Sequence, residues 1–208
     1  MGFKMNYRII ATILAVLMPL ASHSQTLSAA DLKAQVDAAM GGLNEYQVLL
    51  NDPDPARSMK AMQIMMASGE PELVRMAREF GLFSPNVQVQ RAALEAFFNS
   101  SPVLELNIKS AGLDITNFGS TIRGWGGTVF DDGSAFLSLK VGDFDKEQAC
   151  YLNVGYGSCL IRFTETALSI NTWGGWSPIS LNERGNLEGL INIQNADFGV
   201  PTIIVISQ

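Results

Sequence analysis

Histidine is nearly absent from this chain, because His23 is the only one among 208 residues. His23 follows an apolar stretch, residues 9–20, which two basic residues precede and small residues follow. This layout is typical of a secretory signal peptide, and we expect residues 1–24 to be removed by cleavage after Ser24. The chain that remains, residues 25–208, has no imidazole, which excludes hydrolases with a histidine base and metal sites built on histidine.

Basic residues and long apolar runs are also scarce. Removing the leader, which holds Lys4 and Arg8, leaves 14 − 2 = 12 basic residues against 20 acidic ones, a net charge of −8. A surface of this sign repels phosphate backbones and anionic lipids, so we expect no nucleic acid as a partner. The apolar stretch of the leader is shorter than the roughly 20 residues that span a bilayer, and no second one follows, so we expect no membrane insertion after cleavage. We therefore expect an exported protein, periplasmic or extracellular.

Cysteine occurs only twice, as Cys150 and Cys159. An exported protein meets an oxidising environment in which two cysteines pair, and the C-x-x-C spacing of redox-active disulfides is absent. Residues 151–158 have the composition of a hairpin that turns near Val154-Gly155, which would place the two cysteines opposite each other on antiparallel strands. We expect one structural disulfide between them.

Residue composition divides the chain into two halves. Beyond the leader every methionine lies before residue 80, every tryptophan lies after residue 120, and fourteen of the 19 glycines follow Leu106. This favours helices first and strands second. A helical pattern stops near residues 100–102, and an alternation with period two follows it. We predict an α+β protein with a helical domain over residues 25–101 and a strand-rich domain over residues 102–208.

Capping residues, prolines and glycines predict where the helices begin and end. We expect a first helix over residues 28–40, ended by Gly41-Gly42. Asp52-Pro53 has the form of an N-cap followed by a proline at the first helical position. Two further helices are expected to begin at Pro71 and at Ser84-Pro85.

The helical half repeats itself. Residues 50–68 superpose on residues 82–100 at a constant shift, since the matching prolines differ by 85 − 53 = 32, and a fixed period of this size predicts stacked helical hairpins. Residues 89–97 carry a valine and an arginine followed by Ala-Ala-Leu, and so resemble the second helix of short bacterial HEAT repeats. The resemblance covers about residues 43–100 and implies HEAT-like hairpins that serve as a scaffold for protein contacts. A small helical bundle packed on the neighbouring domain is the alternative.

The second half has the pattern of short strands divided by turns, for which Asp131-Asp132-Gly133 gives one of the clearest signals. Many short strands in about a hundred residues predict an antiparallel β-sandwich or jelly roll. The expected strands cover residues 103–108, 113–116, 128–130, 135–141, 150–154, 158–164, 168–171, 179–181, 187–193 and 202–207.

Tryptophans beside glycines are the most suggestive candidates for a ligand site. Trp125 lies in a Gly-Trp-Gly-Gly segment, and Trp173 and Trp176 lie in Thr-Trp-Gly-Gly-Trp. Indole faces stack on sugar rings, and glycine lets a ligand approach the backbone. The three tryptophans are therefore possible ligand-binding residues of a carbohydrate-binding module, although packing in the core is the more frequent role of tryptophan in a sandwich.

Paired carboxylates are the main catalytic route left to a protein without histidine, as in glycoside hydrolysis. Asp132, Glu165, Glu183 and Glu188 are available, but their spacing in the sequence names no pair. The G-x-S-x-G and P-loop patterns are absent, and the acidic residues 143–147 do not match an EF-hand. We therefore expect no catalytic residue, no metal site and no cofactor.

These observations favour an exported, non-catalytic binding or scaffold protein whose partner is another protein. Two alternatives stay open. One is a carbohydrate-binding module that uses the loop tryptophans, and the other is a carboxylate-dependent, glycosidase-like hydrolase.

The signal peptide can be tested directly on the functional protein. Intact-mass analysis of the exported form should give the mass of residues 25–208, because cleavage is expected after Ser24. A mass that still includes residues 1–24 would contradict this prediction.

Overall fold

The computed structural model describes residues 28–109, 115–165, 167–194 and 199–206. The expected leader, residues 1–24, lies outside these ranges. The chain divides into two compact units, residues 1–41 and 42–208, and the second holds most of the helices and all of the strands. In the described ranges no helix has both the length and the apolar character that a membrane crossing needs.

The first helix is longer than predicted. Helix α1 (Ala29–Leu50) continues through Gly41-Gly42, so the prediction that these glycines end it is wrong. Glycine inside a helix costs about 1 kcal/mol relative to alanine, which makes this the weakest stretch of α1. The division between the two compact units falls between these same two glycines.

Helix α2 (Pro55–Ala67) begins two residues later than predicted, because the Asp-Pro pair occurs twice in succession. Asp54, not Asp52, is the N-cap, and its carboxylate accepts a hydrogen bond from the backbone N–H of Ala56 at 2.9 Å. Asp52 instead accepts from the N–H of Asp54 and lies 3.4 Å from the guanidinium Nε of Arg57. Helices α3 (Pro71–Leu82) and α4 (Val87–Asn99) follow.

An internal repeat relates α2 to α4. The two helices begin 87 − 55 = 32 residues apart and end 99 − 67 = 32 residues apart. Local hydrogen bonds repeat at the same shift: Ser58 Oγ donates to the carbonyl of Leu50, and Gln90 Nε2 donates to the carbonyl of Leu82. The N-caps Asp54 and Asn86 are also 32 residues apart. The chain therefore contains two copies of one helical unit, while its HEAT-like character stays a prediction.

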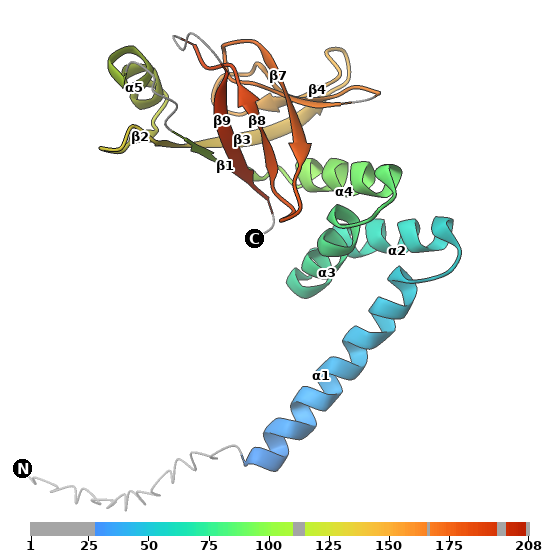
Figure 1. Cartoon of the computed structure of the whole chain (residues 1–208). Helices are drawn as coiled ribbons and strands as arrows, with labels where there is room; N and C mark the ends of the chain where they lie inside the picture. Colours follow the sequence, from blue (N-terminus) through green and yellow to red (C-terminus); the bar gives the residue numbers. More distant parts are fainter. Residues whose placement is uncertain (1–27, 110–114, 166, 195–198, 207–208) are drawn as a thin grey trace, which may run out of the picture. The chain divides into compact units, whose positions relative to one another are not determined.

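The strands form one antiparallel sheet that closes on itself, which makes the second half a barrel. Figure 1 shows this barrel with α4 beneath one end of it. The ring runs β1-β9-β8-β7-β6-β5-β4-β3 and closes where β3 pairs with β1, while β2 pairs with β3 beside the ring. The strands are β1 (Val103–Ile108), β2 (Thr128–Val129), β3 (Ala135–Asp145), β4 (Cys150–Asn153), β5 (Cys159–Phe163), β6 (Leu168–Asn171), β7 (Trp176–Leu181), β8 (Leu187–Ile191) and β9 (Val200–Val205).

The predicted sandwich or jelly roll is wrong, although the α+β class is confirmed. The reason lies in β3, which is 11 residues long and changes neighbours along its length. Its first half pairs with β1, from Ala135 opposite Ile108 to Lys140 opposite Val103. Its second half passes a bulge and pairs with β4. A bulged strand that bends between two neighbours joins both into one closed sheet.

One helix was missed. Helix α5 (Ile115–Gly124) overlaps the strand predicted over residues 113–116, whose first two residues lie outside the described ranges. Phe118 and Ile122 are both buried and lie four residues apart, which is the spacing of one helical face. Gly119 between them weakens the helical pattern in the sequence.

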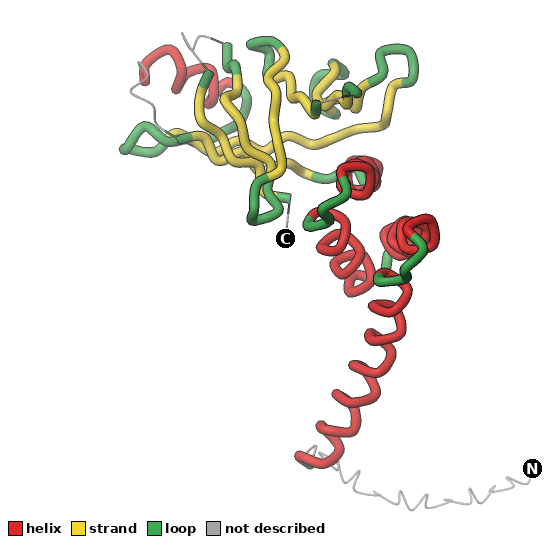
Figure 2. Tube along the Cα trace, turned by 45° about the vertical axis from the view of Figure 1, so that its right-hand side comes forward, coloured by secondary structure: helices red, strands yellow, loops and turns green. Residues whose placement is uncertain are grey.

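Helix α4 lies against one end of the barrel, and the tube in Figure 2 shows the helices beneath the strands in a second view. The ring of Phe98, which is fully buried, lies with its centroid 5.5 Å from that of Tyr151 on β4 and 5.8 Å from that of Phe163 on β5. The Tyr151 hydroxyl donates to Asn99 Oδ1 at 3.0 Å and also lies 3.3 Å from the carbonyl of Glu95. Helices and barrel thus share one core within residues 42–208, and the division predicted at residues 101/102 stays a prediction.

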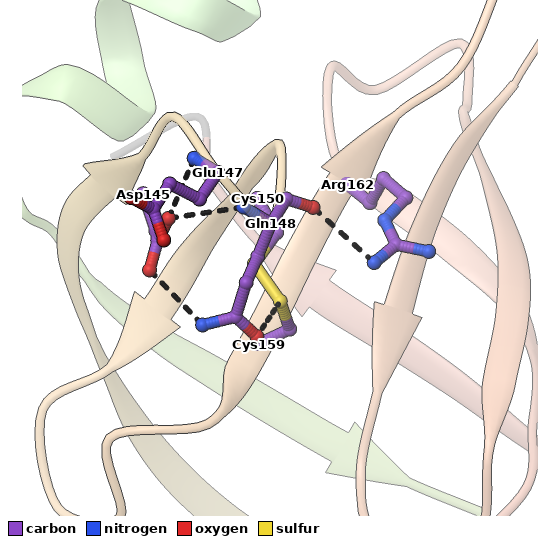
Figure 3. Close-up of a disulfide and its surroundings, with 6 residues drawn as sticks. All are labelled: Asp145, Glu147, Gln148, Cys150, Cys159 and Arg162. Atoms are coloured by element: carbon purple, nitrogen blue, oxygen red, sulfur yellow. Dashed lines mark hydrogen bonds between the residues drawn. A yellow bond between two sulfur atoms is a disulfide. The ribbon is translucent and has the colours of Figure 1, made fainter.

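The predicted disulfide between Cys150 and Cys159 is confirmed, with the two Cα atoms 5.6 Å apart (Figure 3). The register differs from the expected one. Cys159 is paired with Leu152 across the hairpin, because the β4–β5 ladder shifts at a bulge after Tyr151. The bond therefore links diagonal neighbours. It also lies beside Gln148, whose side-chain oxygen is 3.5 Å from Cys159 Sγ.

Reduction of the disulfide should destabilise the protein. Closing a loop of this length contributes about 2 to 3 kcal/mol in the chain-entropy model. Denaturant unfolding with and without reductant should show a difference of this size, and a Cys150→Ala, Cys159→Ala variant should not respond to reductant. Equal stability of the oxidised and reduced wild-type protein would contradict the assignment.

The contact between α4 and β4 should make stability fall at alkaline pH. Burial, and secondarily the charge of Glu95, raise the pKa of Tyr151 to about 12. The folded state therefore favours the neutral phenol, so this contribution is complete below the ordinary pKa of about 10 and is lost as the pH rises toward 12. Near-ultraviolet difference titration should show a late tyrosine transition that Tyr151→Phe removes. An unchanged titration in that variant would contradict the contact.

Candidate functional site

A groove of about 560 Å³ lies between α4 and the adjoining ends of β6, β7 and β8. Its position follows from α4, which packs against β4 and β5 through Phe98 and leaves the other side of this barrel end uncovered. Inward-facing residues at the strand ends form an apolar floor together with the helix. These apolar lining residues are Leu94, Phe163, Leu168, Ile179, Leu181 and Leu187. We call this feature the α4 groove.

Two contacts hold the walls of the α4 groove in place. At one point the turn between β7 and β8 meets the end of α3, where a Cβ added to Gly185 would lie 2.9 Å from the ring of Phe83. At another point Arg91 Nη1 donates to the carbonyl of Thr164, in the turn between β5 and β6, at 2.7 Å. Both turns are therefore fixed against the helices.

The first turn of α4 presents an apolar side chain at the groove. Val87 lines the groove and is 69% exposed. The preceding residue, Asn86, caps the helix by accepting from the N–H of Gln88 at 2.9 Å, so the local backbone is well defined. An exposed valine beside an apolar floor extends the apolar surface of the groove toward solvent.

The charges around the α4 groove are unevenly compensated. The guanidinium of Arg91 is engaged, because its Nε lies 2.8 Å from Glu95 Oε1 and its Cζ lies 5.2 Å from the centre of the Phe163 ring. Glu165 and Glu188 line the same groove and are exposed. Glu188 accepts a hydrogen bond from the neutral amide of Asn182. No ion pair within the described ranges includes either glutamate, so the groove carries uncompensated negative charge.

The carboxylates considered for hydrolysis do not form an evident catalytic pair. Of the four, Glu165 and Glu188 share the α4 groove, whereas Glu183 and Asp132 lie exposed in turns. The pKa of Asp132 is lowered by hydrogen bonds from the hydroxyl and backbone N–H of Ser134. A glycosidase needs one acid that stays protonated through burial. The exposed groove glutamates lack that environment, so no observation here favours the hydrolase.

Metal binding has no candidate within the part of the chain that the structure describes, where no cluster of three or more potential ligands occurs. The acidic residues 143–147 lie at the end of β3 and in the turn that leads to β4. Hydrogen bonds from the backbone N–H and side-chain amide of Gln148, and secondarily from the N–H of Glu147, lower the pKa of the Asp145 carboxyl (Figure 3).

Two of the three candidate tryptophans come together, with a tyrosine that the sequence analysis missed. The ring centroids of Trp125 and Trp173 are 4.5 Å apart, and those of Trp173 and Tyr156 are 4.6 Å apart. We call these three residues the aromatic cluster. A signal for Tyr156 was available, because Gly155-Tyr156-Gly157 repeats the Gly-aromatic-Gly form of the segment around Trp125.

Trp176 lies apart from this cluster. The guanidinium Cζ of Arg162 is 4.3 Å from the centre of one of its rings, a cation–π contact. Arg162 Nη2 also donates to the carbonyl of Gln148 at 3.4 Å, next to the disulfide (Figure 3). One face of Trp176 is therefore covered by a side chain of its own barrel.

The α4 groove itself was not predicted. Its lining comes from α4, from the four strands β5 to β8 and from the turn between β5 and β6, and the pairing that brings them together is not visible in local sequence patterns.

Comparisons of the chain with protein-family models, with curated proteins and with solved structures found no match.

Proposed function

We propose that this protein is an exported, non-catalytic binding protein that acts through protein–protein contacts, with the α4 groove as its contact site. The observation that carries this proposal is the groove, about 560 Å³ in volume, with an apolar floor and Val87 exposed beside it. Apolar surface that stays open to water in a folded protein is typical of interaction sites. The disulfide supports export, because such bonds persist in oxidising compartments.

The partner is an apolar segment flanked by basic residues. Apolar side chains fit the floor of the groove, and Lys or Arg on either side would meet Glu165 and Glu188, which form no ion pair with any residue that the structure describes. The whole chain carries a formal net charge of −6, which attracts a basic partner over longer distances.

The partner is recognised by its side chains and not by strand addition. Each strand of the ring, β1 and β3 to β9, has a neighbour on both sides. Peptides that add a strand need a long open edge, whereas each described strand of the ring is paired on both sides along part of its length, and β2 has two residues. The resemblance of residues 43–100 to HEAT repeats, which serve as contact scaffolds, agrees with this mode of binding.

Site-specific photo-crosslinking tests the contact site. With p-benzoylphenylalanine at position 87, the exported protein should form an adduct of one discrete mass, because Val87 lies at the groove. The same probe at Ile64 is the control, since Ile64 is 58% exposed on α2 and does not line the groove. Adducts of equal yield at both positions, or none at position 87, would contradict the proposal.

The charge of the partner can be tested with the same probe. Glu188→Lys should lower the yield of the adduct at position 87 by about two- to five-fold, since an exposed ion pair contributes up to about 1 kcal/mol. Glu183→Lys is the matched control, because Glu183 is exposed in the neighbouring turn but does not line the groove. Equal yields from both variants would show that the partner is not basic.

A further inference from the structure

We propose that the aromatic cluster is a second binding site, for the pyranose ring of a neutral saccharide. It lies at the other end of the barrel from the α4 groove. The turns that follow β4 and β6 hold Tyr156 and Trp173. The groove is lined by the turn that follows β5 and by the strand ends on either side of the turn that follows β7, and successive turns of an antiparallel sheet alternate between its two ends. The two proposals therefore rest on separate residues.

Three connections of the chain supply one ring each. Trp125 follows α5, Tyr156 belongs to the β4–β5 turn and Trp173 belongs to the β6–β7 turn. The Trp125 and Trp173 rings are inclined by 39°, and Tyr156 meets Trp173 at 75°. Trp125 and Trp173 are partly buried against the core, while Tyr156 is 54% exposed. The two tryptophans thus attach the cluster to the core, while Tyr156 is open to solvent.

Trp173 is held in a backbone conformation that tryptophan rarely adopts. Its φ is +59°, which costs of order 1 kcal/mol for a residue other than glycine. The surroundings fix it there: the N–H of Trp173 donates to Asn171 Oδ1 at 3.1 Å, and Thr172 Oγ1 donates to the carbonyl of Asn192 at 2.8 Å. Strained backbone of this kind clusters at functional sites, so the conformation of Trp173 supports a binding role for its ring.

Glycines adjoin two rings of the aromatic cluster. Gly126 and Gly157, next to Trp125 and Tyr156, have φ values of +81° and +65°, which favour glycine, and an added Cβ at either would meet no described heavy atom within 4 Å, so the space beside them is open. Gly174 has the opposite role. A Cβ there would collide with the backbone of Asn192, so glycine lets the segment that carries Trp173 lie close against the end of β8.

Two exposed amide side chains adjoin the residue that pairs with Trp173, and amides suit hydroxyl groups. Trp173 forms a β-bridge with Ile193, whose neighbours Asn192 and Gln194 are exposed. An amide both donates and accepts hydrogen bonds, which matches a sugar hydroxyl. The C–H face of a pyranose packs against the electron-rich face of an aromatic ring. Rings and amides together therefore favour a neutral sugar over a charged ligand.

Binding of cello-, chito- and xylo-oligosaccharides tests this site. We expect at least one of them to change the tryptophan fluorescence of a Trp176→Phe protein, in which only Trp125 and Trp173 report. Tyr156→Ala in the same background should weaken that binding by about ten-fold, which is the loss expected for one stacked ring. Phe130→Ala is the matched control, because Phe130 is 52% exposed in another turn and should leave binding unchanged.

Thermal melting of both variants checks that each is folded, and calorimetry checks the fluorescence result. Absence of binding by all three oligosaccharides would overturn the proposal, as would equal binding by the Tyr156→Ala and Phe130→Ala proteins. Neither result bears on crosslinking at position 87, so the two proposals fail separately.

Discussion

Burial of Phe98 between Tyr151 and Phe163 is the contact on which the rest of this structure depends. It attaches α4 to β4 and β5, so the helix covers one side of the barrel end and leaves the other side as the α4 groove. Without this contact the groove would lose a wall. The hydroxyl of Tyr151 also donates a hydrogen bond to Asn99 on α4. Because this bond is directional, it fixes the position of the helix along the barrel end.

The internal repeat explains why a barrel packs against the last helix. A helical hairpin cannot cover its own apolar face, so each copy needs a neighbour. Within the repeat, Met66 on α2 corresponds to Phe98 on α4, since 98 − 66 = 32. The first copy packs against α3 and α4, whereas α4 has the barrel as its neighbour. The barrel thus packs against the side of α4 where a further copy of the helical unit would pack in a repeat array, and its other end carries the aromatic cluster.

Local features of this fold could be predicted from the sequence, and non-local ones could not. Strands β1 and β6 were predicted to the residue, because alternation with period two is a property of a few neighbouring positions. Closure of the barrel depends on the pairing of β1 with β3, which no local pattern encodes. The same holds for the sites. The pairing of Cys150 with Cys159 could be predicted, because two cysteines in an exported protein are expected to form a disulfide. The contact of Tyr156 with Trp173 depends on two separate turns and could not.

Phe98 joins α4 and the barrel into one cooperative unit. Native-state hydrogen exchange on a Phe98→Leu protein tests this most directly. The smaller side chain should cost about 1–2 kcal/mol, because it leaves part of a fully buried site unfilled. The account predicts that the most protected amides of α4, β4 and β5 lose the same free energy of exchange. Loss of protection in α4 alone, with β4 and β5 unchanged, would contradict it.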